Sequence, residues 1–226
     1  MTRPAFALGE AQLAAHALAL SAVQRETIAR YVALLRHWNR RINLVGTQDA
    51  ETLWQRHVLD CLMLATVPRP PTPRHWMDVG AGAGLPGVLL AILYPADRIT
   101  AVESVARKAT FLREAARQLA LANFACAHAD VRRLHEEPGF APVDALVARA
   151  FAPLAELLAL GPALLLPGGE VWAMKGRRWP AEAAQVPPAL LAAYEPAPGV
   201  YPYRLGPDAD GVVLVYRLHG HRSTGA

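Results

Sequence analysis

The first part of the chain carries apolar residues at the spacing of an amphipathic helix. Ser21 followed by Gln24 fits a capping box, a signature of a helix start. Beyond it, apolar side chains recur at alternating steps of three and four residues, the spacing of one buried helical stripe: they are Ile28, Tyr31, Leu35, Trp38 and Ile42. The pattern predicts a helix over residues 21–41.

A second helical stretch follows Gly46, where Thr47 or Asp49 can cap the helix start. Its inner side carries mostly apolar residues, namely Leu53, Trp54, His57, Val58, Cys61 and Leu62. Four prolines between Thr66 and Arg74 then mark a stiff connection that no helix can cross. We therefore expect an N-terminal helical extension over residues 1–66, separated by this connection from a larger domain.

Beyond the prolines, short apolar runs alternate with helical stretches, which is typical of β-α-β units and a parallel sheet. The predicted strands are Trp76–Val79, Ile99–Glu103, Phe124–His128, Ala145–Ala148 and Glu170–Met174. A last run, Val212–Leu218, is expected to close the sheet in the antiparallel direction. The fold class is then α/β, a doubly wound, Rossmann-like sheet with helices on both faces over residues 75–218. The ends, residues 1–8 and a tail at 219–226, are expected to be flexible.

Composition limits the compartment and the partner. The formal charge is +4 and the pI about 9.4, which suits an anionic polymer without requiring one. Cys61 and Cys126 lie in apolar segments without a CxxC or Cys/His cluster, so we expect two buried thiols, no metal site and a reducing compartment. Polar residues interrupt the N-terminal apolar run, and prolines and glycines break the others, so we expect a cytoplasmic protein without a membrane segment.

A glycine-rich turn is the strongest chemical signal. Gly80, Gly82, Gly84 and Gly87 follow a predicted strand and open a predicted helix. Backbone without side chains, close to helix N–H groups, lets a ligand come near, and nucleotide-like cofactors bind at this place in open α/β sheets. The alternative is a tight turn without a ligand, but four glycines in eight residues argue against it.

The turn alone does not separate two cofactors. Gly82-x-Gly84-x-x-Gly87 matches the dinucleotide fingerprint, and Glu103 lies at the distance of an acid that binds ribose hydroxyls, so an NAD(P)-binding oxidoreductase stays open.

Three details favour S-adenosylmethionine. Asp78 ends the strand, where its carboxylate can face a cationic amino-acid group. Pro86 removes one N–H that a pyrophosphate would use. Asp130 follows the next strand, where it can hold an adenine amino group. For Glu103 and Asp130, a solvated loop carboxylate is the alternative.

Several further motifs stand in a specific order. They are Trp38-Asn39 with Asn43-Leu44, Arg56-His57-Val-Leu-Asp60, the turn Asp78 to Gly87, Glu103-Ser104 with Arg107-Lys108 and Phe111-Leu112, Arg149-Ala150-Phe151-Ala152, and Lys175-Gly176. In this order the chain resembles, from about Tyr31 to Gly176, the bacterial small-subunit ribosomal RNA methyltransferase G family, also called glucose-inhibited division protein B.

The resemblance implies methyl transfer from S-adenosylmethionine to N7 of one guanine in the 16S ribosomal RNA hairpin loop near the decoding centre. It assigns cofactor contacts to Gly80, Leu85, the Val131-Arg132 pair and Arg149. Glu103 stands where the family more often has Asp, and Arg132 where a carboxylate is common, so only backbone contacts are expected at Arg132. With the residues argued above, the predicted cofactor site is Asp78, Gly80, Gly82, Gly84, Leu85, Glu103, Asp130, Val131, Arg132 and Arg149.

Guanine N7 has a lone pair and no proton, so no general base is assigned, and catalysis rests on alignment and on electrostatics. Arg149 is the best candidate for orienting the reactants; a structural salt bridge is the alternative. For His57, a structural role linking the helical extension to the sheet is favoured over a catalytic one.

Basic clusters suggest an RNA surface: Arg36, Arg40 and Arg41; Arg107, Lys108 and Arg113; and Lys175, Arg177 and Arg178. The resemblance implies that the partner is 16S ribosomal RNA or the small ribosomal subunit, and we expect a monomer. A methyltransferase of a small molecule or protein, and a noncatalytic RNA-binding protein, are the remaining alternatives.

Overall fold

The computed structural model describes residues 10–47, 49–206 and 210–220. The expected flexible start at residues 1–8 lies outside these ranges, as does most of the expected tail. The helices are α1 (Glu10–Ala15), α2 (Ala22–Ile42), α3 (Ala50–Leu53), the π-helical η2 (Trp54–Val58), α4 (Leu59–Leu62), the 3-10 turn η3 (Met63–Thr66), α5 (Gly87–Leu93), α6 (Ala106–Gln118), the 3-10 turn η4 (Val131–Glu136), α7 (Leu154–Leu164), α8 (Trp179–Ala183) and α9 (Pro188–Leu191).

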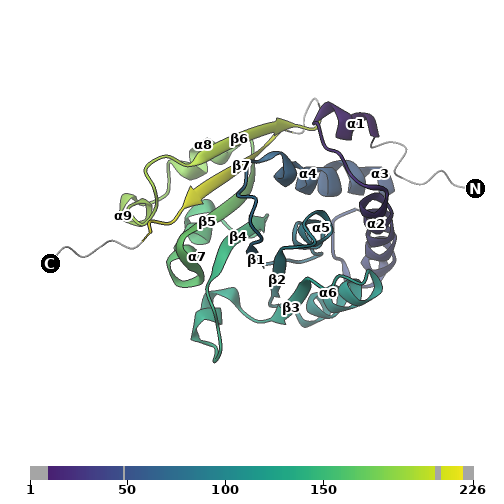
Figure 1. The fold of residues 1–226 in the computed structure, drawn as a ribbon, viewed down its shortest axis with the longest axis horizontal. Coiled ribbons are helices and arrows are strands. Elements are labelled where there is room, and N and C mark those ends of the chain that lie inside the picture. Colours follow the sequence, from purple (N-terminus) through teal and green to yellow (C-terminus); the bar gives the residue numbers. More distant parts are fainter. Residues whose placement is uncertain (1–9, 48, 207–209, 221–226) are drawn as a thin grey trace, which may run out of the picture.

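The strands form one seven-stranded sheet in the order β3-β2-β1-β4-β5-β7-β6 (Figure 1). Their bounds are β1 (His75–Val79), β2 (Arg98–Glu103), β3 (Phe124–His128), β4 (Val143–Arg149), β5 (Leu165–Gly176), β6 (Gly199–Arg204) and β7 (Asp210–Arg217). Strands β1 to β5 pair in parallel, and β7 is antiparallel to β5. The strand order reverses between β1 and β4, so ligands are expected at the carboxyl ends of these strands.

The sheet confirms the predicted fold class and corrects its last strand. The run predicted to close the sheet is β7, and its antiparallel direction was predicted correctly. It is not the edge, because β6 pairs with its outer side. The sequence of β6 contains Pro202, which lacks the N–H that an interior strand needs. For this reason the sequence pattern did not predict a strand here.

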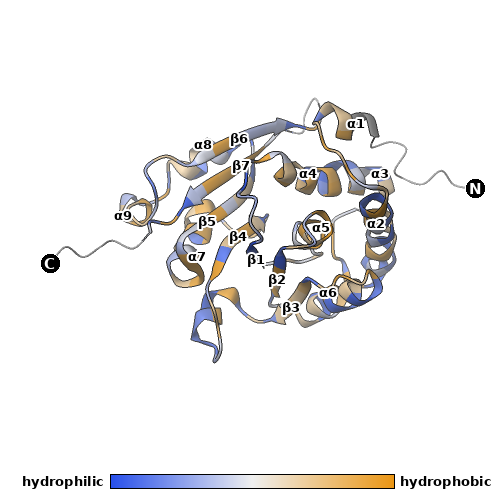
Figure 2. Ribbon diagram, viewed as in Figure 1, coloured by the Kyte–Doolittle hydropathy of each residue, from blue (hydrophilic) through white to orange (hydrophobic). Residues whose placement is uncertain are grey.

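Helices cover both faces of the sheet. Helices α2 to α6 pack on one face and α7 on the other, in two separate apolar clusters. In Figure 1, α2, α5 and α6 lie on one side of the strands and α7 on the opposite side. Helix α5 is apolar and buried over Gly87–Ile92, which fits a helix enclosed between the sheet and α2. Figure 2 shows the resulting contrast between α5 and the hydrophilic outer side of α2.

The N-terminal helices form as predicted. Ser21 caps α2 in a capping box with Gln24, and Asp49 caps α3 by accepting the N–H of Thr52. Their buried side chains join the same apolar cluster as α5 and α6, so the predicted boundary between residues 1–66 and 75–218 crosses a shared core. Cys61 is buried as expected, whereas Cys126 is only partly buried because β3 is an edge strand.

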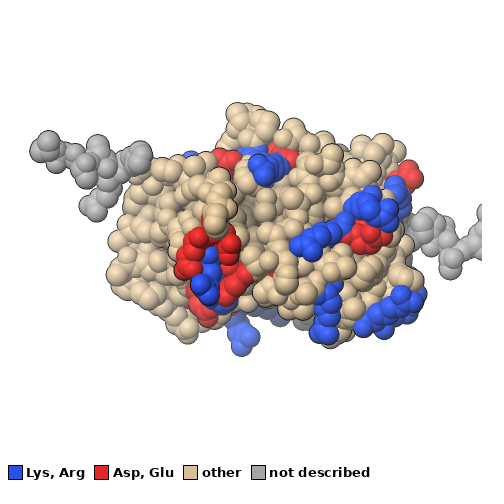
Figure 3. All heavy atoms as spheres, turned by 90° about the horizontal axis from the view of Figure 1, so that it is seen from below, with Lys and Arg blue, Asp and Glu red and all other residues tan. Residues whose placement is uncertain are grey.

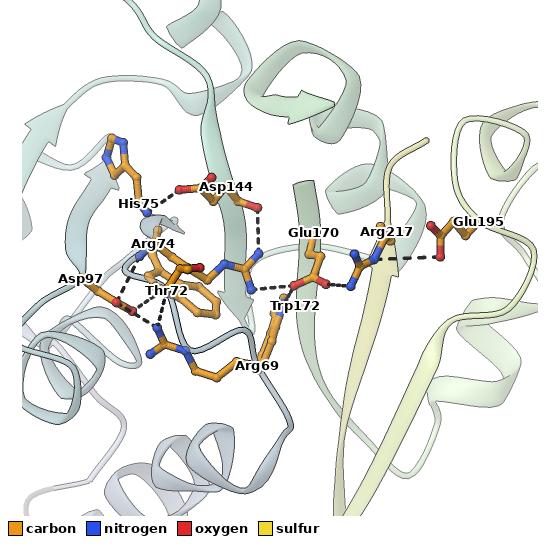
Figure 4. Close-up of polar contacts among 11 residues, drawn as sticks. Arg69, Thr72, Arg74, His75, Asp97, Asp144, Glu170, Trp172, Glu195 and Arg217 are labelled. Atoms are coloured by element: carbon orange, nitrogen blue, oxygen red, sulfur yellow. Dashed lines mark hydrogen bonds and ion pairs between the residues drawn. The ribbon is translucent and has the colours of Figure 1, made fainter. Parts of the chain in front are cut away.

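The amino ends of the parallel strands hold a network of buried ion pairs (Figure 4). Arg74 Nη1 lies 2.7 Å from Glu170 Oε2, and Glu170 Oε1 accepts a hydrogen bond from Arg217 at 2.6 Å. Asp97 accepts from Arg69 and from the backbone N–H of Arg74. These contacts tie the start of β1 to β5 and β7.

Within the described residues, no helix has the length and hydropathy needed to span a membrane.

Candidate cofactor and substrate site

The glycine turn leaves β1 and leads into α5 with an open side. Gly80, Gly82 and Gly84 have φ values of +66°, +55° and +84°, which side chains disfavour. A Cβ on Gly82 would meet only the Gly80 carbonyl oxygen, 3.8 Å away, so space lies open beside the turn. The buried Tyr31 hydroxyl of α2 donates to the Ala83 carbonyl at 2.6 Å, so the N-terminal helices hold this turn directly.

Asp78 is the buried carboxylate beneath the turn. Its Oδ2 accepts the backbone N–H of Gly87 at 2.8 Å, the first N–H of α5. Burial raises the pKa of Asp78 to about 7, although this hydrogen bond acts in the opposite direction. The helix start is thus already occupied by a carboxylate, and Pro86 before it has no N–H. A pyrophosphate would find this end of α5 without its usual donors.

Glu103 closes the turn from the end of β2. Its Oε2 accepts the N–H of Gly82 and its Oε1 the N–H of Val105, both at 2.8 Å. Each carboxylate oxygen has a further lone pair, so it can also accept a ribose hydroxyl. The carboxylate that the spacing predicted is therefore held next to the open side of Gly82.

The site has a negative character that fits a cationic ligand. Asp78 and Glu103 are 1% and 5% exposed. Within the described part of the chain, neither forms an ion pair with a lysine or arginine at 4.0 Å or less. Buried carboxylates without an ion-pair partner favour a ligand that supplies a positive charge. S-adenosylmethionine carries a sulfonium and an ammonium, so these residues fit that cofactor better than an anionic dinucleotide.

The segment after β3 lies differently from the prediction for its side chains. Asp130 is exposed and caps η4, with Oδ1 accepting the N–H of Arg132 at 3.0 Å. The Arg132 guanidinium points to Glu156 at 3.0 Å and lies over the Phe151 ring. Val131 is buried. Contacts of Asp130, Val131 and Arg132 with a cofactor remain predictions.

Arg149, at the end of β4, is held by the N-terminal helices. Its Nε donates to Asp60 Oδ2 at 2.7 Å, and its Nη2 contacts the Arg56 carbonyl at 2.9 Å and His57 Nδ1 at 2.8 Å. Burial and the charge of Arg149 lower the pKa of His57, so its neutral ring can accept this hydrogen bond. His57 thus links the extension to the sheet, as the favoured interpretation had it. Arg149 forms the salt bridge that was its alternative role.

Asp60 extends the same cluster to the C-terminal hairpin, because its Oδ1 accepts the hydroxyl of Tyr203 in β6 at 2.5 Å. Sequence reasoning assigned no role to Asp60 or Tyr203. They are separated by 143 positions, so no local pattern signalled their contact. Asp60 belongs to one of the motifs that carry the family resemblance, and this was the one signal in the sequence that pointed to it.

A cleft of about 1110 Å³ opens beside this cluster at the carboxyl ends of β4 and β5. Its lining includes Arg56, Asp60, Phe151, Met174, Arg178 and Tyr203. The cleft and the glycine turn meet at Phe151, whose ring packs against Gly80. The arrangement therefore places a large opening next to the glycine turn.

The basic clusters do not all reach the cleft. Of the nine residues predicted for RNA binding, Lys175 and Arg178 are the lining members within the described residues. Lys175 is largely buried and its Nζ contacts Glu182 and the Ala152 carbonyl, so its charge is used inside the protein. Arg177 pairs with Asp210, and Arg40 contacts His37. On the face shown in Figure 3, Lys and Arg gather in separate groups, some beside Asp and Glu.

The remaining predicted cations are Arg36, Arg41, Arg107, Lys108 and Arg113. Arg36 and Arg41 lie on the exposed side of α2, whereas Arg107, Lys108 and Arg113 lie on α6. Their contribution to an RNA surface stays a prediction. Exposed Arg56, which the prediction did not include, lies in the wall of the cleft.

The sheet order, the glycine turn and its acidic partners define a class I S-adenosylmethionine-dependent methyltransferase. The model of the family described as rRNA small subunit methyltransferase G matches residues 24–195. The ribosomal RNA small subunit methyltransferase G of Chromohalobacter salexigens is 41% identical over 179 residues, covering 79% of this chain and 83% of the relative. That of Paracoccus denitrificans is 42% identical over 167 residues, with 72% and 83% covered. The chain belongs to the rRNA small subunit methyltransferase G family.

Solved structures with low sequence identity share the fold. Pyrococcus horikoshii TYW2, solved in complex with MeSAdo, superposes with a TM-score of 0.56 at 18% identity; 74% of this chain is covered, and the chain spans 64% of that structure. Aeropyrum pernix fibrillarin, solved with natively bound S-adenosyl-L-methionine, gives a TM-score of 0.53 at 18% identity, with 72% and 75% covered. The solved structures confirm the predicted fold class, and the family match confirms the predicted family and, with it, a methyltransferase that uses S-adenosylmethionine rather than an oxidoreductase.

Proposed function

We propose that the chain transfers a methyl group from S-adenosylmethionine to N7 of one guanine in the 16S ribosomal RNA hairpin near the decoding centre. It would do so as a cytoplasmic monomer that binds the RNA or the small ribosomal subunit. The observation that carries the proposal is the pair of buried carboxylates, Asp78 and Glu103, around a glycine turn that opens next to a wide cleft. Family membership supplies the class of substrate.

The cofactor supplies an electrophilic methyl group on a sulfonium. We assign its binding to the predicted set: Asp78, Gly80, Gly82, Gly84, Leu85, Glu103, Asp130, Val131, Arg132 and Arg149. Glu103 would accept the ribose hydroxyls, and Asp78 would compensate positive charge from below the turn. Arg149 would act by holding the end of β4 against the extension, because its side chain is already bound by Asp60 and His57.

Guanine N7 carries no proton, so methylation there requires no general base from the chain. Its work is therefore to hold the base edge toward the methyl group and to exclude competing nucleophiles. The size of the cleft supports this, since a base turned out of an RNA loop enters a site of this kind more easily than a paired one. RNA phosphates would meet Arg56 and Arg178 at its wall.

The test is transfer of tritium from labelled S-adenosylmethionine to small ribosomal subunits from a strain that lacks the protein. The product is mapped by chemical cleavage at N7-methylguanine. We expect one labelled guanine in the 16S hairpin near the decoding centre. Label at another atom or another RNA would contradict the proposal, and no label on RNA despite cofactor binding would indicate a small-molecule or protein substrate.

A further inference from the structure

Phe151 stands at the junction of the two halves of the site. It lines the cleft, and a Cβ built on Gly80 would overlap its ring, so the ring rests directly on the backbone of the cofactor turn. The ring is partly exposed, whereas most large apolar side chains nearby are buried. A partly exposed aromatic ring between the glycine turn and the cleft is in position to contact a substrate that enters the cleft.

The backbone around Phe151 directs its side chain there. Ala150 has a φ of +53°, an unfavourable value for a residue with a side chain. This left-handed residue follows directly after β4, and the next residue, Phe151, packs against Gly80. Strain of this type persists where the surroundings impose it, and it marks functional sites more often than others.

The loop is also braced from β5 and α8. Lys175 Nζ donates to the Ala152 carbonyl at 2.8 Å and to Glu182 Oε2 at 2.7 Å, and Glu182 Oε2 accepts the N–H of Leu154 at 3.2 Å. The Lys175 side chain is only 12% exposed. A largely buried lysine that serves a loop carbonyl fixes the loop, so the Phe151 ring is held before any substrate arrives.

We propose that Phe151 contacts the substrate as the stacking surface for the target base. The inference rests on the proposed function and names how the base is held. A purine ring nitrogen presents its lone pair in the plane of the ring, so the base must meet the methyl group by its edge. Its face is then available for an aromatic side chain, which fixes the ring plane and leaves the edge free. The Arg132 guanidinium lies over the ring, 5.4 Å from its centroid, and this cation–π contact helps to hold the ring in place.

The experiment compares wild type with Phe151→Leu, which keeps an apolar side chain but loses the ring. Two quantities are measured: kcat/KM for methylation of small subunits and the Kd for S-adenosylhomocysteine. We expect kcat/KM to fall about 5- to 100-fold, the range for losing one base–aromatic stack. The Kd for S-adenosylhomocysteine should stay within about twofold, because the cofactor turn keeps its backbone contacts.

Three further variants make the result specific. Phe151→Tyr keeps the ring and should recover most of the lost activity, and Phe151→Met gives a second ring-free side chain should leucine lower the Tm. Phe140→Leu changes a partly buried phenylalanine that packs in the same cluster as α7 but does not line the cleft, so its kcat/KM should match wild type.

Unchanged kcat/KM in a folded ring-free variant would overturn the inference. An equal loss of kcat/KM and of S-adenosylhomocysteine affinity would also overturn it, since Phe151 would then only support the cofactor turn. If the wild-type protein itself labels no RNA, the proposed function fails together with the inference. The wild-type reaction, measured first, separates these two failures.

Discussion

Buried carboxylates lie at both ends of the parallel strands, in opposite electrostatic settings. We call these ends the amino edge and the carboxyl edge of the sheet. At the amino edge, Glu170 is bonded to Arg74, Arg217 and the indole N–H of Trp172. Burial alone would raise the pKa of Glu170, but these hydrogen bonds and charges outweigh it and lower the pKa. At the carboxyl edge, burial dominates and raises the pKa of Asp78 to about 7, because its bonding partner is a backbone N–H.

The comparison distinguishes a carboxylate that stabilises the fold from one that is available to bind a ligand. A buried carboxylate that is neutralised by arginine has its bonding capacity used within the protein, and it stabilises the start of the sheet. A buried carboxylate without a cation costs stability, and such groups gather at binding sites. The same sheet therefore has one edge that is electrostatically closed and one that is prepared for a cationic ligand.

The largest expected effect is at the amino edge. Glu170→Ala leaves Arg74, whose side chain is 7% exposed, as an uncompensated buried charge. We expect the free energy of unfolding to fall by about 3–5 kcal/mol in urea denaturation. Arg217→Ala, which removes a half-exposed partner of the same carboxylate, should cost clearly less. If Glu170→Ala lowered the free energy of unfolding by less than about 1 kcal/mol, the buried ion pair with Arg74 would contribute no more to stability than an exposed one.

The second effect is the pH dependence that Asp78 imposes. Its pKa in the folded protein, about 7, lies above its ordinary value of 3.8, so the folded state holds the proton more tightly. Stability should therefore decrease as the pH rises from about 4 to about 7, by up to about 4 kcal/mol, and level off above that. Asp78→Asn keeps an oxygen for the Gly87 N–H and should remove this decrease in urea unfolding measured across the range. An equal decrease in the variant would assign it to another group.

Glu103→Gln tests the carboxyl edge with an intermediate effect. The amide keeps one acceptor oxygen, so it can no longer serve both backbone N–H groups and the ribose hydroxyls. We expect the Kd for S-adenosylhomocysteine in calorimetry to rise about 10- to 100-fold, with a stability loss of about 1 kcal/mol. Glu136→Gln, at an exposed ion pair, should change neither quantity. Wild-type affinity in Glu103→Gln would remove this carboxylate from the proposed site.

The smallest effect concerns the RNA surface. Arg178 is exposed at the wall of the cleft, whereas Arg41 lies on α2 outside the lining. Arg178→Ala should raise the KM for small subunits about 3- to 10-fold and reduce the salt dependence of binding by about one phosphate contact. Arg41→Ala is the matched control and should stay close to wild type. The reverse result would indicate that the RNA binds along α2 and not at the cleft.

The sequence by itself determined the local elements and the glycine turn of this protein. The capping box at Ser21, the stripe from Ile28 to Ile42 and the glycines at 80–87 act over a few residues, so their pattern is legible without a fold. The position of Glu103 was also predictable, because the carboxyl ends of neighbouring parallel strands meet at one sheet edge.

Only the tertiary structure decided which charges are bound within the protein and which side chains share the cleft. Arg149 meets Asp60 across 89 positions, Asp60 meets Tyr203 across 143, and Arg74 meets Glu170 across 96. A charged residue has the same local pattern whether it is paired or open to a ligand. Its partner is brought to it by the long-range pairing of strands and helices, and this pairing decides its role.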